Sequence, residues 1–204
     1  MKRILCFGDS NTYGYNPTNG QRYDDNSRWT KVLEKSLGQE YKIIEAGCNN
    51  RTAFKKNPCG IRQTGIEILP TYLMQNPDIV ILFIGTNDLQ LQYGTQISEF
   101  YEGITKIIDI VRQNSLSTDI ILCAPPSITQ NLQKTFFADL FDEMAIINSR
   151  KLPEIYNKIA IEKACVYLNL DKLVTVSAID GIHLDVSAHK IIGEKLAELL
   201  LNSF

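Results

Sequence analysis

Residues 79–88 read Ile-Val-Ile-Leu-Phe-Ile-Gly-Thr-Asn-Asp, an apolar run that ends in small and polar residues. A continuous apolar run of this length is typical of a parallel strand that is covered on both faces. Glycine, asparagine and aspartate favour a turn directly after such a strand. The stretch therefore predicts a buried strand whose carboxyl end carries polar side chains.

Similar apolar runs and segments of helical period alternate along the rest of the chain. The other apolar runs cover 3–7, 42–46, 119–123 and 165–169. The helical segments cover 27–38, 96–114, 139–163 with a break at Pro153, and a last helix that starts after Asp185. This alternation predicts an α/β fold with a parallel sheet in a three-layer sandwich. A chain of 204 residues fits a single domain over 1–204.

Composition excludes several classes of protein. The formal net charge is −2, which does not fit the basic surface of a nucleic-acid binder. The apolar run after Arg3 stops after four residues, and no stretch reaches the roughly 18 apolar residues of a membrane span. We expect a cytoplasmic protein without a membrane span. The five cysteines are odd in number and form no Cys-x-x-Cys pair, so we expect neither a disulfide framework nor a metal site.

The first strand is followed by Gly8-Asp9-Ser10. Ligands of parallel sheets bind beyond the carboxyl ends of the strands, so chemistry is expected at this position. Ser10 would stand at a helix N-terminus, where free backbone N–H groups favour developing negative charge. Serine is also a common helix cap, and a cap is the better interpretation of Ser10 taken alone.

Two more strand ends and one late loop carry residues of complementary chemistry. Gly47 follows the second strand and Asn87 the third, and a backbone or amide N–H at either position could bind an oxyanion. Each could equally serve a turn. His183 follows Asp180 by three residues, which lets the carboxylate orient the imidazole as a general base. Together these positions supply the parts of an acyl-transfer site.

The segments resemble the SGNH, or GDSL-type, hydrolases in identity and in order along the chain. The matching segments are Gly8-Asp9-Ser10, Gly47, Gly85-Thr86-Asn87-Asp88 and Asp180-Gly181-Ile182-His183. The resemblance implies a flavodoxin-like five-stranded parallel sheet and a serine esterase that needs no cofactor. It implies Ser10, Asp180 and His183 as catalytic residues, with the oxyanion hole made by Ser10, Gly47 and Asn87.

Further matches are similar to the arylesterase and acyltransferase branch of that family. They include Arg28-Trp29-Thr30 and Arg51-Thr52. The resemblance implies small acyl esters as substrates and transfer of the acyl group to water or an alcohol. Some members of the branch form homo-oligomers. Asn11 departs from the leucine that the family most often has. The residues expected to shape the substrate pocket are Asn11, Tyr13, Tyr15, Trp29, Phe136 and Phe137, although Trp29 fits the core better.

Other functions stay open at this point. The same site could remove acetyl groups from sugars, hydrolyse lysophospholipids or cleave thioesters. A non-catalytic α/β module that binds a small ligand is a further alternative. Phosphate binding at the first turn is disfavoured, because neither Gly-x-x-x-x-Gly-Lys nor Gly-x-Gly-x-x-Gly follows the first strand.

Overall fold

One parallel sheet organises the computed structural model, which describes residues 1–57 and 63–203. Its strands are β1 (Lys2–Gly8), β2 (Tyr41–Gly47), β3 (Ile79–Phe83), β4 (Asp119–Ala124) and β5 (Val166–Asn169). Their order in the sheet is β2-β1-β3-β4-β5, and every neighbouring pair is parallel. The predicted five-stranded parallel sheet is confirmed.

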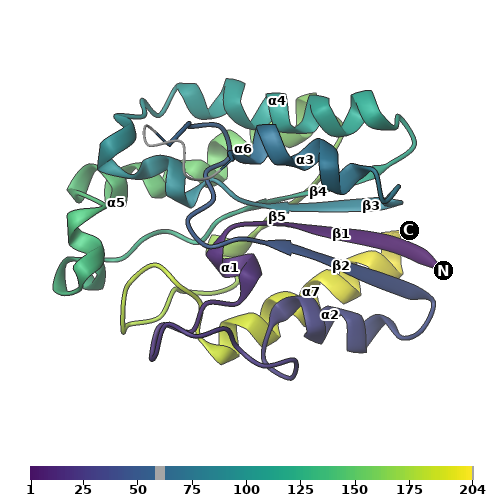
Figure 1. The fold of residues 1–204 in the computed structure, drawn as a ribbon, viewed down its shortest axis with the longest axis horizontal. Coiled ribbons are helices and arrows are strands. Elements are labelled where there is room, and N and C mark those ends of the chain that lie inside the picture. The colour runs from purple at the N-terminus through teal and green to yellow at the C-terminus, as the bar shows by residue number, and fades with distance from the viewer. Residues whose placement is uncertain (58–62, 204) are drawn as a thin grey trace.

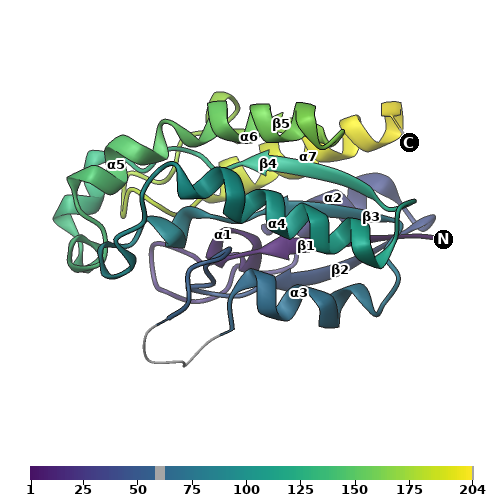
Figure 2. The ribbon, with the colours of Figure 1, turned by 90° about the horizontal axis from the view of Figure 1, so that it is seen from above.

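Helices cover both faces of this sheet. They are α1 (Ser10–Tyr13), α2 (Trp29–Leu37), α3 (Gly65–Leu73), α4 (Glu99–Asn114), α5 (Glu143–Ser149), α6 (Leu152–Glu162) and α7 (Val186–Ser203). The helices α3, α4 and α6 lie on one face, and α2 and α7 lie on the other (Figure 1). Figure 2 shows α4 and α6 running along the sheet, with the loops and α5 gathered at its carboxyl end. The result is the predicted three-layer sandwich.

Short 3₁₀ helices line the loops at the carboxyl end of the sheet. They are η1 (Thr86–Leu89), η2 (Leu91–Tyr93), η3 (Gln130–Lys134), η4 (Phe136–Asp139) and η5 (Leu170–Lys172). Of these, η1 follows β3 directly and η3 and η4 follow β4. Of these helices, η1 and η4 supply Asn87, Phe136 and Phe137 to the pocket beside Ser10.

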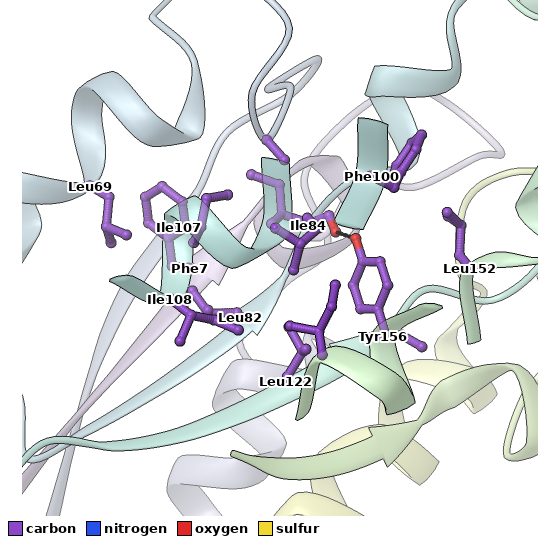
Figure 3. Close-up of a cluster of buried hydrophobic side chains, with 14 of the residues drawn as sticks. Phe7, Leu69, Leu82, Ile84, Phe100, Ile107, Ile108, Leu122, Leu152 and Tyr156 are labelled. Atoms are coloured by element: carbon purple, nitrogen blue, oxygen red, sulfur yellow. Dashed lines mark hydrogen bonds between the residues drawn. The ribbon is translucent and has the colours of Figure 1, made fainter. Parts of the chain in front are cut away.

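The core beneath α3, α4 and α6 fixes the end of β3. Figure 3 shows this cluster, in which the buried Tyr156 of α6 donates a hydrogen bond to the carbonyl oxygen of Ile84 at 2.7 Å. Gly85 follows with φ 124°, and a Cβ atom there would lie 2.2 Å from the Tyr156 hydroxyl. Only glycine fits this turn. The turn places η1, which includes Asn87, at the carboxyl edge of the sheet.

The helices differ from the prediction at two places in the chain. The helix α3 was not predicted, because Pro70 interrupts the apolar pattern; the proline is tolerated inside the helix. A capping box of Thr64 and Glu67 starts this helix and was its best signal in the sequence. The predicted segment 139–163 is two helices, since α5 ends at Ser149 and α6 begins at Leu152 with Pro153 in its first turn.

Several negative findings hold for residues 1–57 and 63–203. No helix there combines the length and apolar character that crossing a membrane requires. The same residues contain no cluster of His, Cys, Asp and Glu suited to a metal ion. Within them Cys6, Cys48, Cys123 and Cys165 are free thiols. Cys59 lies outside the described residues.

Candidate active site

Ser10, His183 and Asp180 form a continuous hydrogen-bonded chain at the carboxyl end of the sheet. His183 Nε2 lies 3.0 Å from Ser10 Oγ, and His183 Nδ1 lies 2.6 Å from Asp180 Oδ2. Ser10 is the first residue of α1, while the other two lie in the loop before α7. A serine, an imidazole and a carboxylate in this order are the arrangement that activates a hydroxyl nucleophile.

Asp180 is fixed by backbone as well as by the imidazole. Its Oδ1 accepts the N–H of Ile182 at 3.1 Å and the N–H of His183 at 3.0 Å. Burial raises the pKa of this carboxyl, but the hydrogen bond and charge of His183 outweigh burial, so the pKa lies below its ordinary value. Asp180 is therefore an anion at neutral pH, and its second oxygen faces the imidazole.

A pocket of about 200 Å³ opens in front of Ser10 and His183. Its lining comprises Ser10, Tyr15, Asn49, Asn50, Asn87, Gln90, Phe136, Phe137, Leu140, Phe141, Ile182 and His183. Side-chain amides come from the loop after β2 and from η1, while aromatic rings come from η4 and from the segment after α1. The pocket thus has an amide wall and an aromatic wall, with Ser10 and His183 between them.

The aromatic wall packs directly on the imidazole. The Tyr15 ring lies 4.1 Å from the His183 ring between centroids, and the Phe137 ring lies 5.2 Å from it. Phe136 stacks on Phe137 at 4.0 Å and keeps 67% of its surface exposed at the mouth of the pocket. Tyr15, Phe136 and Phe137, which were predicted for the substrate pocket, are all among its lining residues.

The loop after β2 is held in place by two buried charges. The Asp88 carboxylate accepts the backbone N–H groups of Ala53, Phe54 and Lys55 at 2.6 to 3.0 Å. Burial nevertheless raises the pKa of Asp88 to about 6. Arg51 donates to the carbonyl oxygens at the ends of β1 and β2. These contacts bring the loop alongside η1 and Ser10.

Gly47 does not lie in the pocket, which corrects its prediction as an oxyanion donor. Gly47 pairs with Gly8, and Cys48 N–H donates to the Gly8 carbonyl oxygen at 3.2 Å. In a parallel ladder alternate N–H groups point to opposite sides, so the Gly47 N–H points away from β1. A Cβ atom on Gly47 would lie 2.1 Å from Tyr13 N. This glycine is needed for close packing against α1.

Asn50, three residues after Gly47 in the loop that follows β2, does lie in the pocket lining. It has φ 60°, a left-handed conformation that asparagine adopts more readily than most residues. Within the described residues its backbone N–H donates to no protein acceptor. The sequence signal was the pair Asn49-Asn50, which favours such a turn.

Three residues predicted for the pocket lie outside its lining. Asn11 is a buried tether: its Oδ1 accepts the N–H of Leu184 at 3.0 Å, and its Nδ2 donates to the carbonyl oxygen of Ile182 at 3.3 Å. Tyr13 turns away and packs under the guanidinium of Arg22. Trp29 is fully buried and belongs to the core, as its helical pattern favoured. Asn11 thus positions the loop that carries His183.

Gln90 is one of the pocket residues that were not predicted from the sequence, with Asn49, Asn50, Leu140, Phe141 and Ile182. It follows η1, and its amide Nε2 lies within hydrogen-bond distance of both Asn50 Oδ1 and Asn87 Oδ1. The 3₁₀ geometry of η1 brings residues three apart onto one side. A turn-forming sequence gives no sign of that geometry.

Comparisons with known proteins agree with this fold. The model of the GDSL-like lipase/acylhydrolase family matches residues 6–191. The inhibitor-bound aryl esterase of M. smegmatis superimposes with a TM-score of 0.93 and is 26% identical, with 100% of each chain covered. A carbohydrate acetylesterase from Sinorhizobium meliloti superimposes with a TM-score of 0.92, at 26% identity and 100% coverage of each chain. No curated protein matches the sequence significantly. The chain therefore belongs to the GDSL-like lipase/acylhydrolase family, with the SGNH hydrolase fold, and is an esterase.

Proposed function

We propose that the protein hydrolyses small acyl esters through an acyl-serine intermediate. Ser10 Oγ attacks the ester carbonyl carbon while His183 Nε2 takes the hydroxyl proton, and Asp180 stabilises the resulting imidazolium. The imidazolium then protonates the departing alkoxide, which leaves the acyl group on Ser10. Water, deprotonated by the same imidazole, attacks the acyl-serine and releases the acid. An alcohol in place of water gives a new ester. The observation that carries this proposal is the chain of hydrogen bonds at 3.0 and 2.6 Å.

The oxyanion is proposed to bind three N–H donors. The backbone N–H of Ser10 has no protein acceptor within the described residues, which fits its place at the start of α1. Asn50 N–H is the donor from the loop after β2, in place of the Gly47 predicted from the sequence. Asn87 Nδ2 uses one hydrogen on the Arg51 carbonyl oxygen at 3.1 Å and has a second to give. Donors preorganised in this way stabilise charge as it develops.

The size of the pocket supports a short acyl group. Its volume of about 200 Å³ is below the roughly 300–1,000 Å³ of sites for drug-sized ligands. Phe137 and Phe141 close it on the apolar side. Acetyl and propionyl groups fit such a space, whereas the long chain of a lysophospholipid does not.

Enlarging this pocket is expected to relax the chain-length preference. With 4-nitrophenyl esters, kcat/KM of the wild-type enzyme should fall from acetate to octanoate. Phe137→Ala should raise the octanoate-to-acetate ratio about 10-fold, because each methylene newly buried contributes roughly 0.8 kcal/mol. Leu116→Ala is the control, since Leu116 is exposed and precedes β4 at the opposite end of the sheet. An unchanged ratio in Phe137→Ala would place the acyl group elsewhere.

A specific observation also favours an acetylated carbohydrate as the substrate. Amides of Asn49 and Asn50 line the same pocket as the exposed ring of Phe136. Amides exchange hydrogen bonds with sugar hydroxyls, and the superimposed Sinorhizobium meliloti protein is a carbohydrate acetylesterase. Measuring kcat/KM for acetylated sugars beside phenyl acetate separates the sugar and aryl preferences.

A fluorophosphonate probe tests the acyl-serine mechanism itself. We expect one equivalent of probe to attach to the peptide that contains Ser10, with loss of 4-nitrophenyl acetate hydrolysis in step with labelling. The probe mimics the tetrahedral intermediate and requires an activated hydroxyl. Full turnover by unlabelled protein at saturating probe would contradict the mechanism. Labelling at another serine would move the nucleophile.

A further inference from the structure

We propose that Gln90 is a positioning residue that keeps two segments of the oxyanion hole, the loop after β2 and η1, in fixed positions relative to each other. This inference rests on the proposed function. Gln90 Nε2 lies 2.6 Å from Asn50 Oδ1 and 2.9 Å from Asn87 Oδ1. Asn50 lies in the loop after β2 and Asn87 in η1, so one amide nitrogen joins two separate segments. These are the segments that carry two of the three proposed N–H donors.

One backbone carbonyl group, that of Arg51, determines how the side-chain amides of this hydrogen-bonded series are oriented. Asn87 faces the backbone carbonyl oxygen of Arg51, which can only accept, so Asn87 presents Nδ2 to it and Oδ1 to Gln90. Gln90 must then offer its nitrogen to Asn87. That same nitrogen faces Asn50, so Asn50 presents its oxygen. The orientation of each side-chain amide in this hydrogen-bonded series is thereby determined by the one before it.

Both hydrogens of the Gln90 amide are used in these contacts. Its oxygen accepts Gln92 Nε2 at 2.8 Å, and only 1% of the Gln90 surface is exposed. Water therefore cannot readily replace the side chain, and removing it leaves buried oxygens on Asn50 and Asn87 unsatisfied. Asn87 is then free to rotate its amide, which would turn an oxygen toward the developing oxyanion. The expected loss is in transition-state stabilisation, with substrate binding little changed.

The test compares two nearly isosteric substitutions. Gln90→Met removes the hydrogen bonds to Asn50 and Asn87, together with the one from Gln92, and adds no charge. Gln90→Glu instead puts carboxylate oxygens against the oxygens of Asn50 and Asn87. With 4-nitrophenyl acetate we expect kcat to fall roughly 10- to 100-fold in Gln90→Met, less than the 10²–10³-fold typical of losing an oxyanion donor. Gln90→Glu should lose more. KM should stay within about three-fold of the wild-type value in Gln90→Met, as expected when an interaction serves only the transition state.

Non-additivity distinguishes positioning from general stability. In an Asn87→Ala background, Gln90→Met should lower kcat by a much smaller factor than in the wild type, since part of its action passes through Asn87. The proposal would be overturned if the loss of kcat in the double variant equalled the product of the losses in Gln90→Met and Asn87→Ala. It would also be overturned if Gln90→Met raised KM and left kcat unchanged. A thermal unfolding midpoint for each variant identifies any that is not folded. Gln90→Leu, which also removes the amide and adds no charge, then replaces Gln90→Met in the cycle and is read by the same criteria.

Matched controls separate this inference from the proposed function. Gln96→Met makes the same chemical change in an exposed glutamine whose side-chain amide donates to the Gly94 carbonyl oxygen, and it should match the wild type. Wild-type protein that is not labelled at Ser10 by the fluorophosphonate would contradict the proposed function. Wild-type labelling at Ser10 together with unchanged kcat in Gln90→Met would overturn the role of Gln90 alone.

Discussion

Ser10→Ala is expected to abolish ester hydrolysis while leaving the fold intact. Turnover of 4-nitrophenyl acetate should fall on the order of 10⁶-fold, because the acyl group has no oxygen to which it can be transferred. The residual rate over water comes from the oxyanion donors and from binding. Alanine is tolerated at the start of α1, since the Asp9 carboxylate supplies the cap by accepting the N–H of Asn11 at 3.0 Å. The measurement is kcat with the variant at high concentration, together with its unfolding midpoint.

Ser98→Ala supplies the matched control for this loss. Ser98 is exposed at the start of α4, and its side chain makes no capping hydrogen bond. This variant should keep wild-type turnover. Ser10→Ala that retains more than about 1% of wild-type turnover would contradict a nucleophilic role, given the magnitudes seen for such residues.

The main elements of the fold follow from sequence pattern because their physical causes are local. Continuous apolar runs such as 79–84 cannot be covered except by helices on both faces, which determines the parallel sheet. The structure confirms it, with β3 over Ile79–Phe83. The helix α3 escaped prediction because Pro70 normally interrupts a helix. Its capping box outweighs that expectation once α3 packs on the sheet.

The sequence predicts which kinds of residue form the candidate site, but not which position within a loop supplies each of them. Ser10, Asp180 and His183 were predicted because they lie at a strand end or before the last helix and together supply a nucleophile, a base and a carboxylate. Gly47 was predicted because glycine could offer an unobstructed N–H, and Asn50 was not considered. The small size of Gly47 instead allows its close approach to Tyr13 N. A three-residue shift within one loop depends on the buried Asp88 and Arg51 contacts, which join segments far apart in sequence.

Asp180→Asn is expected to lower kcat about 10⁴-fold by changing which imidazole nitrogen holds the proton. The backbone N–H groups of Ile182 and His183 keep the carbonyl oxygen of the new amide on their side, where Oδ1 now accepts both. The amide NH₂ then faces His183 Nδ1, where Asp180 Oδ2 now lies at 2.6 Å. Two donors cannot face each other, so the proton moves to Nε2. Ser10 then meets a donor in place of a base.

The same substitution at Asp185 separates this effect from the general loss of a carboxylate. Asp185 is exposed and caps α7 by accepting the N–H of Ala188 at 2.8 Å, a role that asparagine fills equally well. Asp185→Asn should keep kcat and the unfolding midpoint. In Asp180→Asn the fluorophosphonate should still label Ser10, but far more slowly, because the nucleophile is present and only its base is lost. A kcat within ten-fold of the wild type would mean that His183 keeps its Nδ1 proton without Asp180, and that the orienting role lies elsewhere.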